Sequence, residues 1–348
     1  MRSSLRRLTI APLLGLATAA VLAGVGWYAL NQGKLSKTSA PIEDSGRATP
    51  KANQRTVVLA NGAARRDSTG NAVLADAIVT LERYAHISAL VQQHAHFGAL
   101  EIIGEGSYHQ QGRGEQRQIK WVLRTQLGDE SASLVQLVDD RFLWIDKRLP
   151  TTRRVDRVDL WRLRRLTADK ELPPIAPGQA AFADGGLNAW QNFGGLPMLL
   201  EAMSRSFDFA APRQVQYGNE QVYALRGVWK PEKLRELLGV PQVDDNQAAS
   251  IEIPPRVPLD VLVFLGSRDY FPFMIQYRGT DDPTLAADAP ISGMYQESDR
   301  PLMRIKLYQV SFAAPINPNE FVFTMPSDVD WVDATPRYIE RLKMTNDE

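Results

Sequence analysis

Apolar and polar positions alternate with a period of two along several stretches of the chain. In the clearest stretch, Ile119, Trp121 and Leu123 fall on one side, while Lys120 and Arg124 fall on the other. This period is that of a β-strand with one buried face. Short turns separate the stretches, which predicts an antiparallel meander and argues against a βαβ series. The predicted strands are residues 89–97, 118–127, 133–138, 142–146, 214–217, 221–229, 257–265 and 272–278.

Other stretches carry apolar residues three and four positions apart, which is the spacing of an amphipathic helix. The first stripe runs from Leu74 to Ala85. In a longer one, two glycines and a proline at 194–197 predict a break and a restart of the helix. Residues 172–186, rich in Pro, Ala and Gly, are predicted to form a surface loop that acts as a lid. The predicted helices before the C-terminus are residues 74–85, 158–166, 187–205 and 231–238.

Residues 302–326 are predicted to form two strands joined by a Pro/Asn loop. In the second strand, Phe321, Phe323 and Met325 alternate with smaller side chains. We interpret this pair as the edge or the seam of one large antiparallel sheet. The chain then closes with a short helix that begins at Thr335, an N-cap followed by a proline.

The charge and cysteine content exclude several classes of function. The 348 residues include 40 basic and 40 acidic side chains and no cysteine. Balanced charge gives no electrostatic reason to expect nucleic acid as a partner. The lack of thiols excludes disulfides, thiol catalysis, iron–sulfur clusters, cysteine zinc sites and acylation at a lipobox.

The N-terminal segment is predicted to anchor the chain in a membrane. Residues 8–30 carry no charge, and a helix of about 20 apolar residues crosses a bilayer. Arginines precede this segment, so the positive-inside rule places the rest of the chain outside the cytoplasm. A signal peptide cleaved at 17–19 is the alternative. We favour an uncleaved, single-pass inner-membrane anchor at 1–30, a flexible linker at 31–69 and one domain in the periplasm or cell exterior at 70–348.

Histidines and paired carboxylates are the candidates for chemistry. His94 and His96 are two apart on a predicted strand, so both rings project from the same face, and His86 lies nearby in sequence. No carboxylate stands at a motif-like spacing, and two imidazoles alone make a weak metal site. The adjacent Asp pairs fall in predicted turns, and no hydrolase motif is present. We therefore predict no enzyme, no metal and no other cofactor.

Six arginines are concentrated in a short stretch of the middle of the chain. They predict the solvated face of a helix, and a docking patch for acidic headgroups or a partner is the alternative. These residues are Arg153, Arg154, Arg157, Arg162, Arg164 and Arg165.

Large apolar side chains come from both the predicted strands and the predicted helices. A sheet curved around helices can leave an apolar cavity between the layers, and such a pocket suits acyl chains. The alternative is that the same side chains fill the core. The candidate ligand-binding residues are Trp121, Leu123, Phe142, Trp144, Trp190, Leu196, Leu199, Met203, Phe273 and Phe323.

Three stretches carry the motifs of a known family. Residues 74–109 contain the opening helix and first strands, and residues 133–149 read SLVQLVDDRFLWIDKRL. Residues 315–333 contain the pattern F-x-F-x-x-P-x-x-V-D, which begins at Phe321 and ends at Asp330. Together these motifs resemble the outer-membrane lipoprotein-sorting family, the LolA/LolB-like half-barrels.

The resemblance implies an α+β fold in which a large, curved antiparallel sheet forms an incomplete barrel over a few helices, behind the N-terminal transmembrane helix. It implies an apolar cavity, a lipid or lipoprotein acyl chain as partner, and no catalysis. The predicted tether and the missing lipobox depart from the family's released carrier and lipidated acceptor. They favour a membrane-anchored variant that meets other envelope proteins. The alternative is a non-catalytic scaffold with a filled half-barrel.

Overall fold

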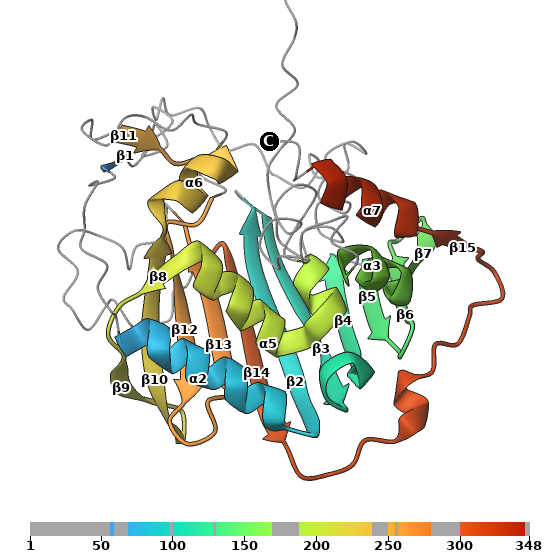
Figure 1. Ribbon diagram of the computed structural model, residues 1–348, viewed down its shortest axis with the longest axis horizontal. Helices are drawn as coiled ribbons and strands as arrows, with labels where there is room; N and C mark the ends of the chain where they lie inside the picture. The colour runs from blue at the N-terminus through green and yellow to red at the C-terminus, as the bar shows by residue number, and fades with distance from the viewer. Residues whose placement is uncertain are drawn as a thin grey trace, which may run out of the picture.

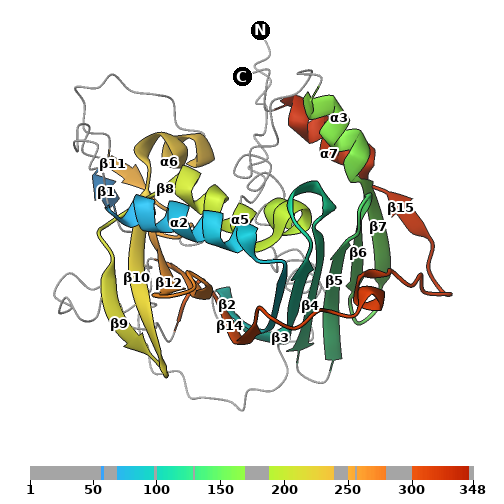
Figure 2. The same ribbon diagram turned by 60° about the horizontal axis from the view of Figure 1, so that its bottom comes forward.

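A large sheet with helices on one face makes up most of the chain. The computed structural model describes residues 56–58, 69–97, 100–127, 130–168, 188–238, 250–254, 257–279 and 300–344. Within these residues, thirteen strands form one open, curved sheet (Figures 1 and 2). The predicted α+β fold with a large, mostly antiparallel sheet is therefore confirmed.

Three predicted segments lie wholly or largely outside the described residues, namely the membrane anchor at 8–30, the linker at 31–69 and the loop at 172–186. In the part of the chain that the structure describes, no helix has both the length and the apolar character to cross a membrane. The anchor and the lid therefore stay predictions.

The sheet consists of two antiparallel halves. Its first half contains β2 (His86–Phe97), β3 (Leu100–Gln111), β4 (Gln118–Leu127), β5 (Glu130–Val138), β6 (Phe142–Arg148) and β7 (Arg153–Asp159). The second half contains β8 (Phe207–Phe209), β9 (Arg213–Tyr217), β10 (Glu220–Trp229), β12 (Asp260–Gly266), β13 (Pro272–Arg278) and β14 (Met303–Ser311). A short strand, β15 (Trp331–Asp333), returns to the first half. The order across the sheet is β15-β7-β6-β5-β4-β3-β2-β14-β13-β12-β10-β8, and β9 pairs with β10 off this path. β15 runs parallel to its neighbour β7. β1 (Thr56–Val58) and β11 (Ser250–Glu252) form a separate small sheet.

β14 is the seam between the two halves. Met303 pairs with Ala95 of β2, and Ile305 lies opposite Ile275 of β13. The first strand predicted within residues 302–326 is therefore confirmed, and so is its place at a seam.

Two helices cover one face of the sheet, which we call the inner face. The described helices are α2 (Thr69–Arg83), α3 (Leu160–Ala168), α5 (Asn188–Ser206), α6 (Pro231–Leu238) and α7 (Thr335–Met344). Of these, α2 and α5 lie side by side across the inner face (Figures 1 and 2). Leu74 and Leu81 of α2 are fully buried there, as the predicted stripe requires. Ile78 of that stripe is only partly buried, Ala77 is fully buried beside it, and the helix ends at Arg83, before Ala85. The opposite side of the sheet is the outer face.

The second strand predicted within residues 302–326 is wrong. Pro318–Phe321 form a 3-10 helix, η5, and the following residues up to Asp330 are not in a strand. The Asn317 side chain accepts a hydrogen bond from the Asn319 N–H and starts the turn. Both edges of β14 are already paired, so no strand position beside it is left for this segment. The segment crosses the outer face instead, and β15 forms the edge of the sheet (Figure 2).

The helical prediction for the arginine stretch is wrong in its first half. Arg153, Arg154 and Arg157 belong to β7, where Val155 and Val158 are buried. Arg153 pairs across the strands with Asp146 at 2.7 Å. The period of two was hidden because charged and apolar residues do not alternate strictly in this strand.

The C-terminal helix begins at Thr335, as predicted. Its cap differs from the prediction, because the Asp333 carboxylate accepts the hydrogen bond from the Thr335 N–H at 3.0 Å. The Thr335 hydroxyl instead accepts from the Asp159 N–H at 2.9 Å. This contact joins α7 to the end of β7.

A buried ion cluster lies in the second half of the sheet. Asp260 and Arg278 are fully buried and make two hydrogen bonds of 2.7 and 2.6 Å. Arg226 donates a third hydrogen bond to the same carboxylate at 2.6 Å.

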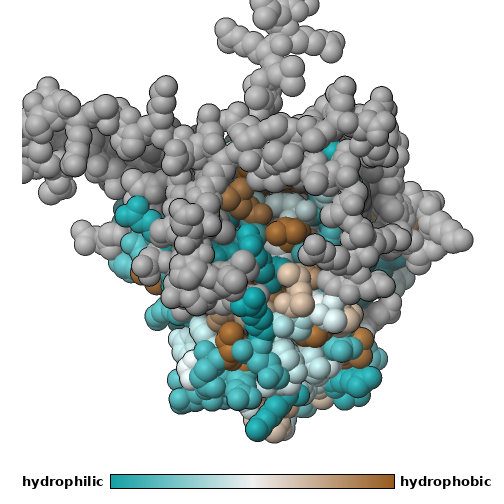
Figure 3. Space-filling view, turned by 90° about the vertical axis from the view of Figure 1, so that its left-hand side faces the viewer, coloured by the Kyte–Doolittle hydropathy of each residue, from teal (hydrophilic) through white to brown (hydrophobic). Residues whose placement is uncertain are grey.

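The end of the molecule that carries β9 and β10 shows its described hydrophobic side chains in separate small patches among hydrophilic ones (Figure 3).

Candidate functional site

Five of the ten predicted ligand-binding residues meet in one apolar layer beneath α5. Trp121 and Leu123 project from β4, and Leu196, Leu199 and Met203 project from α5. All five belong to the same core cluster, and each side chain is only 1 to 2 % exposed. The chain's own side chains therefore close this layer, which we call the α5 layer.

The first half of the helix α5 ends at a break just before the residues of the α5 layer. Gly195 has φ 65° and ψ −148°, so the helix that begins at Asn188 stops and restarts there. A Cβ atom at Gly195 would lie 2.3 Å from the Tyr108 hydroxyl oxygen. Glycine is therefore needed here both for the backbone angle and for the close approach of Tyr108.

Three polar side chains of the sheet side hold this break. The Tyr108 hydroxyl accepts from the Leu196 N–H at 3.2 Å and donates to Gln110 at 2.5 Å. Arg117 donates to the Gly194 carbonyl at 3.1 Å and pairs with Glu82 of α2 at 2.9 Å. Burial raises the pKa of the Tyr108 hydroxyl, which therefore stays protonated and able to donate.

Three other predicted residues lie together on the outer face. In β6, Leu143 and Ile145 are buried on the inner side, so the pleat turns Phe142 and Trp144 outward. Trp144 stacks on Phe323 with 4.7 Å between ring centroids and 3° between planes. These residues help to hold the C-terminal segment on the sheet and do not line the α5 layer.

Of the two remaining predicted residues, Phe273 belongs to neither group. Phe273 of β13 is half-buried and packs edge-on against Phe271, with centroids 5.4 Å apart. The side chain of Trp190 lies outside what the structure describes.

An open groove lies on the outer face. Its volume is about 1050 Å³, close to the upper end of the range of small-molecule sites. Leu90, Ile103 and Tyr308 are exposed on its floor, with Ile103 50 % exposed. An ion pair of 2.5 Å between Lys120 and Glu320 closes one side. The lining residues are Leu90, Glu101, Ile103, Glu105, Gly106, Ser107, Lys120, Val122, Arg124, Thr125, Gln126, Ser131, Tyr308 and Glu320.

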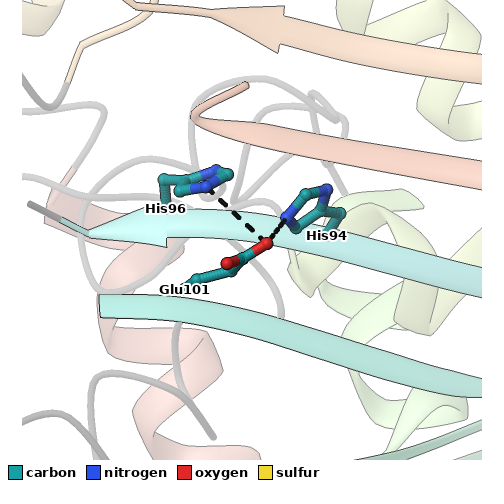
Figure 4. A group of neighbouring side chains, drawn as sticks. All are labelled: His94, His96 and Glu101. Atoms are coloured by element: carbon teal, nitrogen blue, oxygen red, sulfur yellow. Dashed lines mark hydrogen bonds and ion pairs between the residues drawn. The ribbon is translucent and has the colours of Figure 1, made fainter. Parts of the chain in front are cut away.

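At the end of β2, two histidines and a glutamate converge on the same outer face (Figure 4). Glu101 lies opposite His96 in the pairing of β2 with β3. Its Oε1 atom is 2.6 Å from His94 Nε2 and 3.9 Å from His96 Nε2. The prediction that His94 and His96 share the polar face of their strand is confirmed.

The Nδ1 atoms of the two histidine rings have different hydrogen-bond partners. Arg304 Nη2 donates to His94 Nδ1 at 3.0 Å, and His96 Nδ1 donates to the Pro301 carbonyl at 3.1 Å. Burial, opposed by the hydrogen bond to Glu101, lowers the pKa of the His94 imidazole. Neutral His94 therefore carries its proton on Nε2 and donates it to Glu101.

Comparison with known proteins gives matches among solved structures. No family model matches this chain, and no curated protein matches it. An uncharacterized conserved protein from Thermus thermophilus matches at 7 % identity and TM-score 0.36, covering 76 % of this chain and 99 % of that one. A putative outer membrane lipoprotein-sorting protein domain from Vibrio parahaemolyticus matches at 10 % identity and TM-score 0.31, covering 73 % and 96 %.

A LolA superfamily protein from Nitrosomonas europaea matches at 11 % identity and TM-score 0.25, covering 73 % of this chain and 97 % of that one. The matches thus include structures of the family that the sequence motifs resemble. At these TM-scores they carry nothing about ligand or activity.

Two features of the site were missed by sequence reasoning. Glu101 was overlooked as a neighbour of the histidines because its distance along the chain fits no metal motif. Only two residues connect Phe97 of β2 to Leu100 of β3, and this short connection places Glu101 beside His96. The short connection was therefore the feature of the sequence from which the contact could have been predicted. The outer groove depends on the path of residues 312–330 across the sheet, and no local pattern predicts that path.

Proposed function

We propose that this chain binds the acyl chain of a lipid or lipoprotein beneath α5. The observation that carries the proposal is the α5 layer, in which apolar side chains of a sheet and of a broken helix pack together, next to the polar side chains that hold the break. The N-terminal segment at 8–30 anchors the chain in the inner membrane, and the domain from residue 70 onward faces the envelope. The chain then acts in lipid or lipoprotein trafficking and is not an enzyme.

Entry of an acyl chain requires the second half of α5 to move away from β4. The acyl chain would take over the contacts that Leu196, Leu199 and Met203 make with the sheet, so apolar burial is exchanged and not lost. Each methylene buried is worth about 0.8 kcal/mol. The hydrogen bonds at Tyr108 and Arg117, each worth about 1 kcal/mol, oppose this opening. The exchange therefore favours a long acyl chain over a short one.

Native mass spectrometry of the full chain purified from cells, followed by lipid extraction, tests this proposal. We expect a co-purifying acyl lipid that is lost in Leu199→Trp, because the larger ring fills the α5 layer. Leu262→Trp is the matched control, since Leu262 is equally buried but belongs to the separate cluster around Phe264. That variant should keep the lipid.

The second candidate is a scaffold whose half-barrel is filled by its own side chains. The near-complete burial of the five residues of the α5 layer favours it. A chain that carries no lipid in the wild type, or that loses lipid equally in Leu199→Trp and Leu262→Trp, supports the scaffold and contradicts acyl-chain binding.

A further inference from the structure

We propose that His94, His96 and Glu101 form a binding site for a divalent metal ion of the zinc class. One ligand atom from each of the three residues lies within 4.8 Å of the other two. Two ligand atoms bound to one tetrahedral zinc lie ~3.3 Å apart. The observed separations from Glu101 Oε1, 2.6 and 3.9 Å, bracket this value. Small side-chain rotations are therefore enough to bring all three atoms to one ion.

The backbone holds these side chains in place before any ion arrives. His94 and His96 are two residues apart on β2, so their rings project from one face. β2 is paired on both sides, with β3 and with β14, and Glu101 comes from the strand position opposite His96. A site on two adjacent strands inside the sheet needs little ordering when it binds its ion.

His96 already has the tautomer that a metal requires. Its Nδ1–H donates to the Pro301 carbonyl at 3.1 Å, which leaves the Nε2 lone pair on the side of Glu101. Hydrogen bonds of this kind orient most metal-bound histidines. His96 therefore provides the first ligand without rearrangement of its hydrogen-bond partner.

His94 binds the ion only after a proton and a neighbour have moved. Its Nε2–H now donates to Glu101, and Arg304 Nη2 donates to its Nδ1 at 3.0 Å. Metal binding moves the ring proton from Nε2 to Nδ1. There the proton would lie against the N–H that Arg304 donates, so the guanidinium must turn away. Arg304 therefore opposes the metal, through both its charge and its hydrogen bond.

The ligand set indicates the class of metal and the kind of site. Two imidazoles and a carboxylate suit zinc, cobalt or nickel better than calcium, which prefers oxygen ligands alone. Three protein ligands leave a fourth position open to water, and the Glu101 side chain is 54 % exposed. We therefore infer an exchangeable site and not a closed structural one. The chain has no cysteine, so no thiolate competes for the ion.

Titration of the tag-free full chain with cobalt(II), followed by visible absorption and by competition with zinc, tests the site. We expect one ion per chain, and His96→Ala or Glu101→Gln should weaken binding by at least about tenfold. His109→Ala is the control, because His109 lies on the outer face of β3 outside the cluster, and its affinity should match the wild type. Arg304→Gln should tighten binding by about tenfold, the size of effect that residues around a metal site have.

Three results would overturn the proposal. The first is the absence of saturable cobalt binding in the wild type. The second is an affinity that His96→Ala and His109→Ala change to the same extent. The third is weaker binding in Arg304→Gln, because the structure makes Arg304 a competitor of the metal.

Discussion

Asp260 is fully buried in the second half of the sheet, and its carboxylate binds two arginines. Arg278 and Arg226 together give its carboxylate three hydrogen bonds between 2.6 and 2.7 Å. A carboxylate taken out of water is stable only when it keeps such partners. Sequence reasoning missed this cluster, because Asp260 and Arg278 stand in separate strands and become partners only through the pairing of β12 with β13.

Asp260→Asn should lower the free energy of unfolding by about 3 to 5 kcal/mol, because the fully buried Arg278 loses the charge that compensates its burial. Glu201→Gln is the control, since it removes an exposed pair with Arg205, worth no more than about 1 kcal/mol. Urea unfolding with an unchanged slope measures both values. Equal losses in the two variants would contradict this account of Asp260.

At the scale of elements, helices and strands with a regular period could be predicted from the sequence. The stripe that begins at Leu74 and the glycines at 194–195 gave α2 and the break in α5. Segments whose structure depends on distant partners could not be predicted. Residues 319–325 have the alternation of a strand but no open edge to pair with, so they lie across the outer face.

The break in α5 predicts unequal effects of alanine at two glycines. Gly195 and Gly218 both have positive φ, but a Cβ meets Tyr108 at the first and nothing within 4 Å at the second. Gly218→Ala should cost about 1 to 2 kcal/mol for the backbone alone. Gly195→Ala should cost about 1 to 3 kcal/mol more, because the layer is overpacked as well. Thermal unfolding of both variants measures the difference, and equal costs would mean that Tyr108 moves away freely.

The attachment of the C-terminal segment should depend on pH. Lys120 donates a hydrogen bond to Glu320, and this contact lowers the pKa of the Glu320 carboxyl below its ordinary 4.5. The stabilisation is therefore present above about pH 4.5 and is lost as the pH falls through the lower, folded value. Glu320→Gln should remove this pH dependence and speed amide hydrogen exchange in residues 312–330 at neutral pH. Unchanged exchange in the variant would show that stacking of Phe323 on Trp144 is sufficient.

At the scale of the whole molecule, the two halves of the sheet meet only because β14 returns to β2. Arg304 of β14 lies opposite His94 across a chain separation of 210 residues. The sequence predicted the strands of each half and the helices over them. It did not predict which face each aromatic takes, so Phe142, Trp144 and Phe323 were grouped with residues of the α5 layer from which the sheet separates them.

We propose that an acyl chain binds beneath α5 after the helix opens at Gly195. Crosslinking of a diazirine-bearing fatty acid to the full chain, mapped by peptide mass spectrometry, tests it most directly. We expect labels in residues 118–127 and 196–206, and faster labelling in Tyr108→Phe, which removes the hydrogen bond to the Leu196 N–H. Tyr277→Phe is the matched control, because that hydroxyl is equally buried but has no hydrogen-bond partner within the described residues. Labels elsewhere, or identical rates in the two variants, would contradict the account.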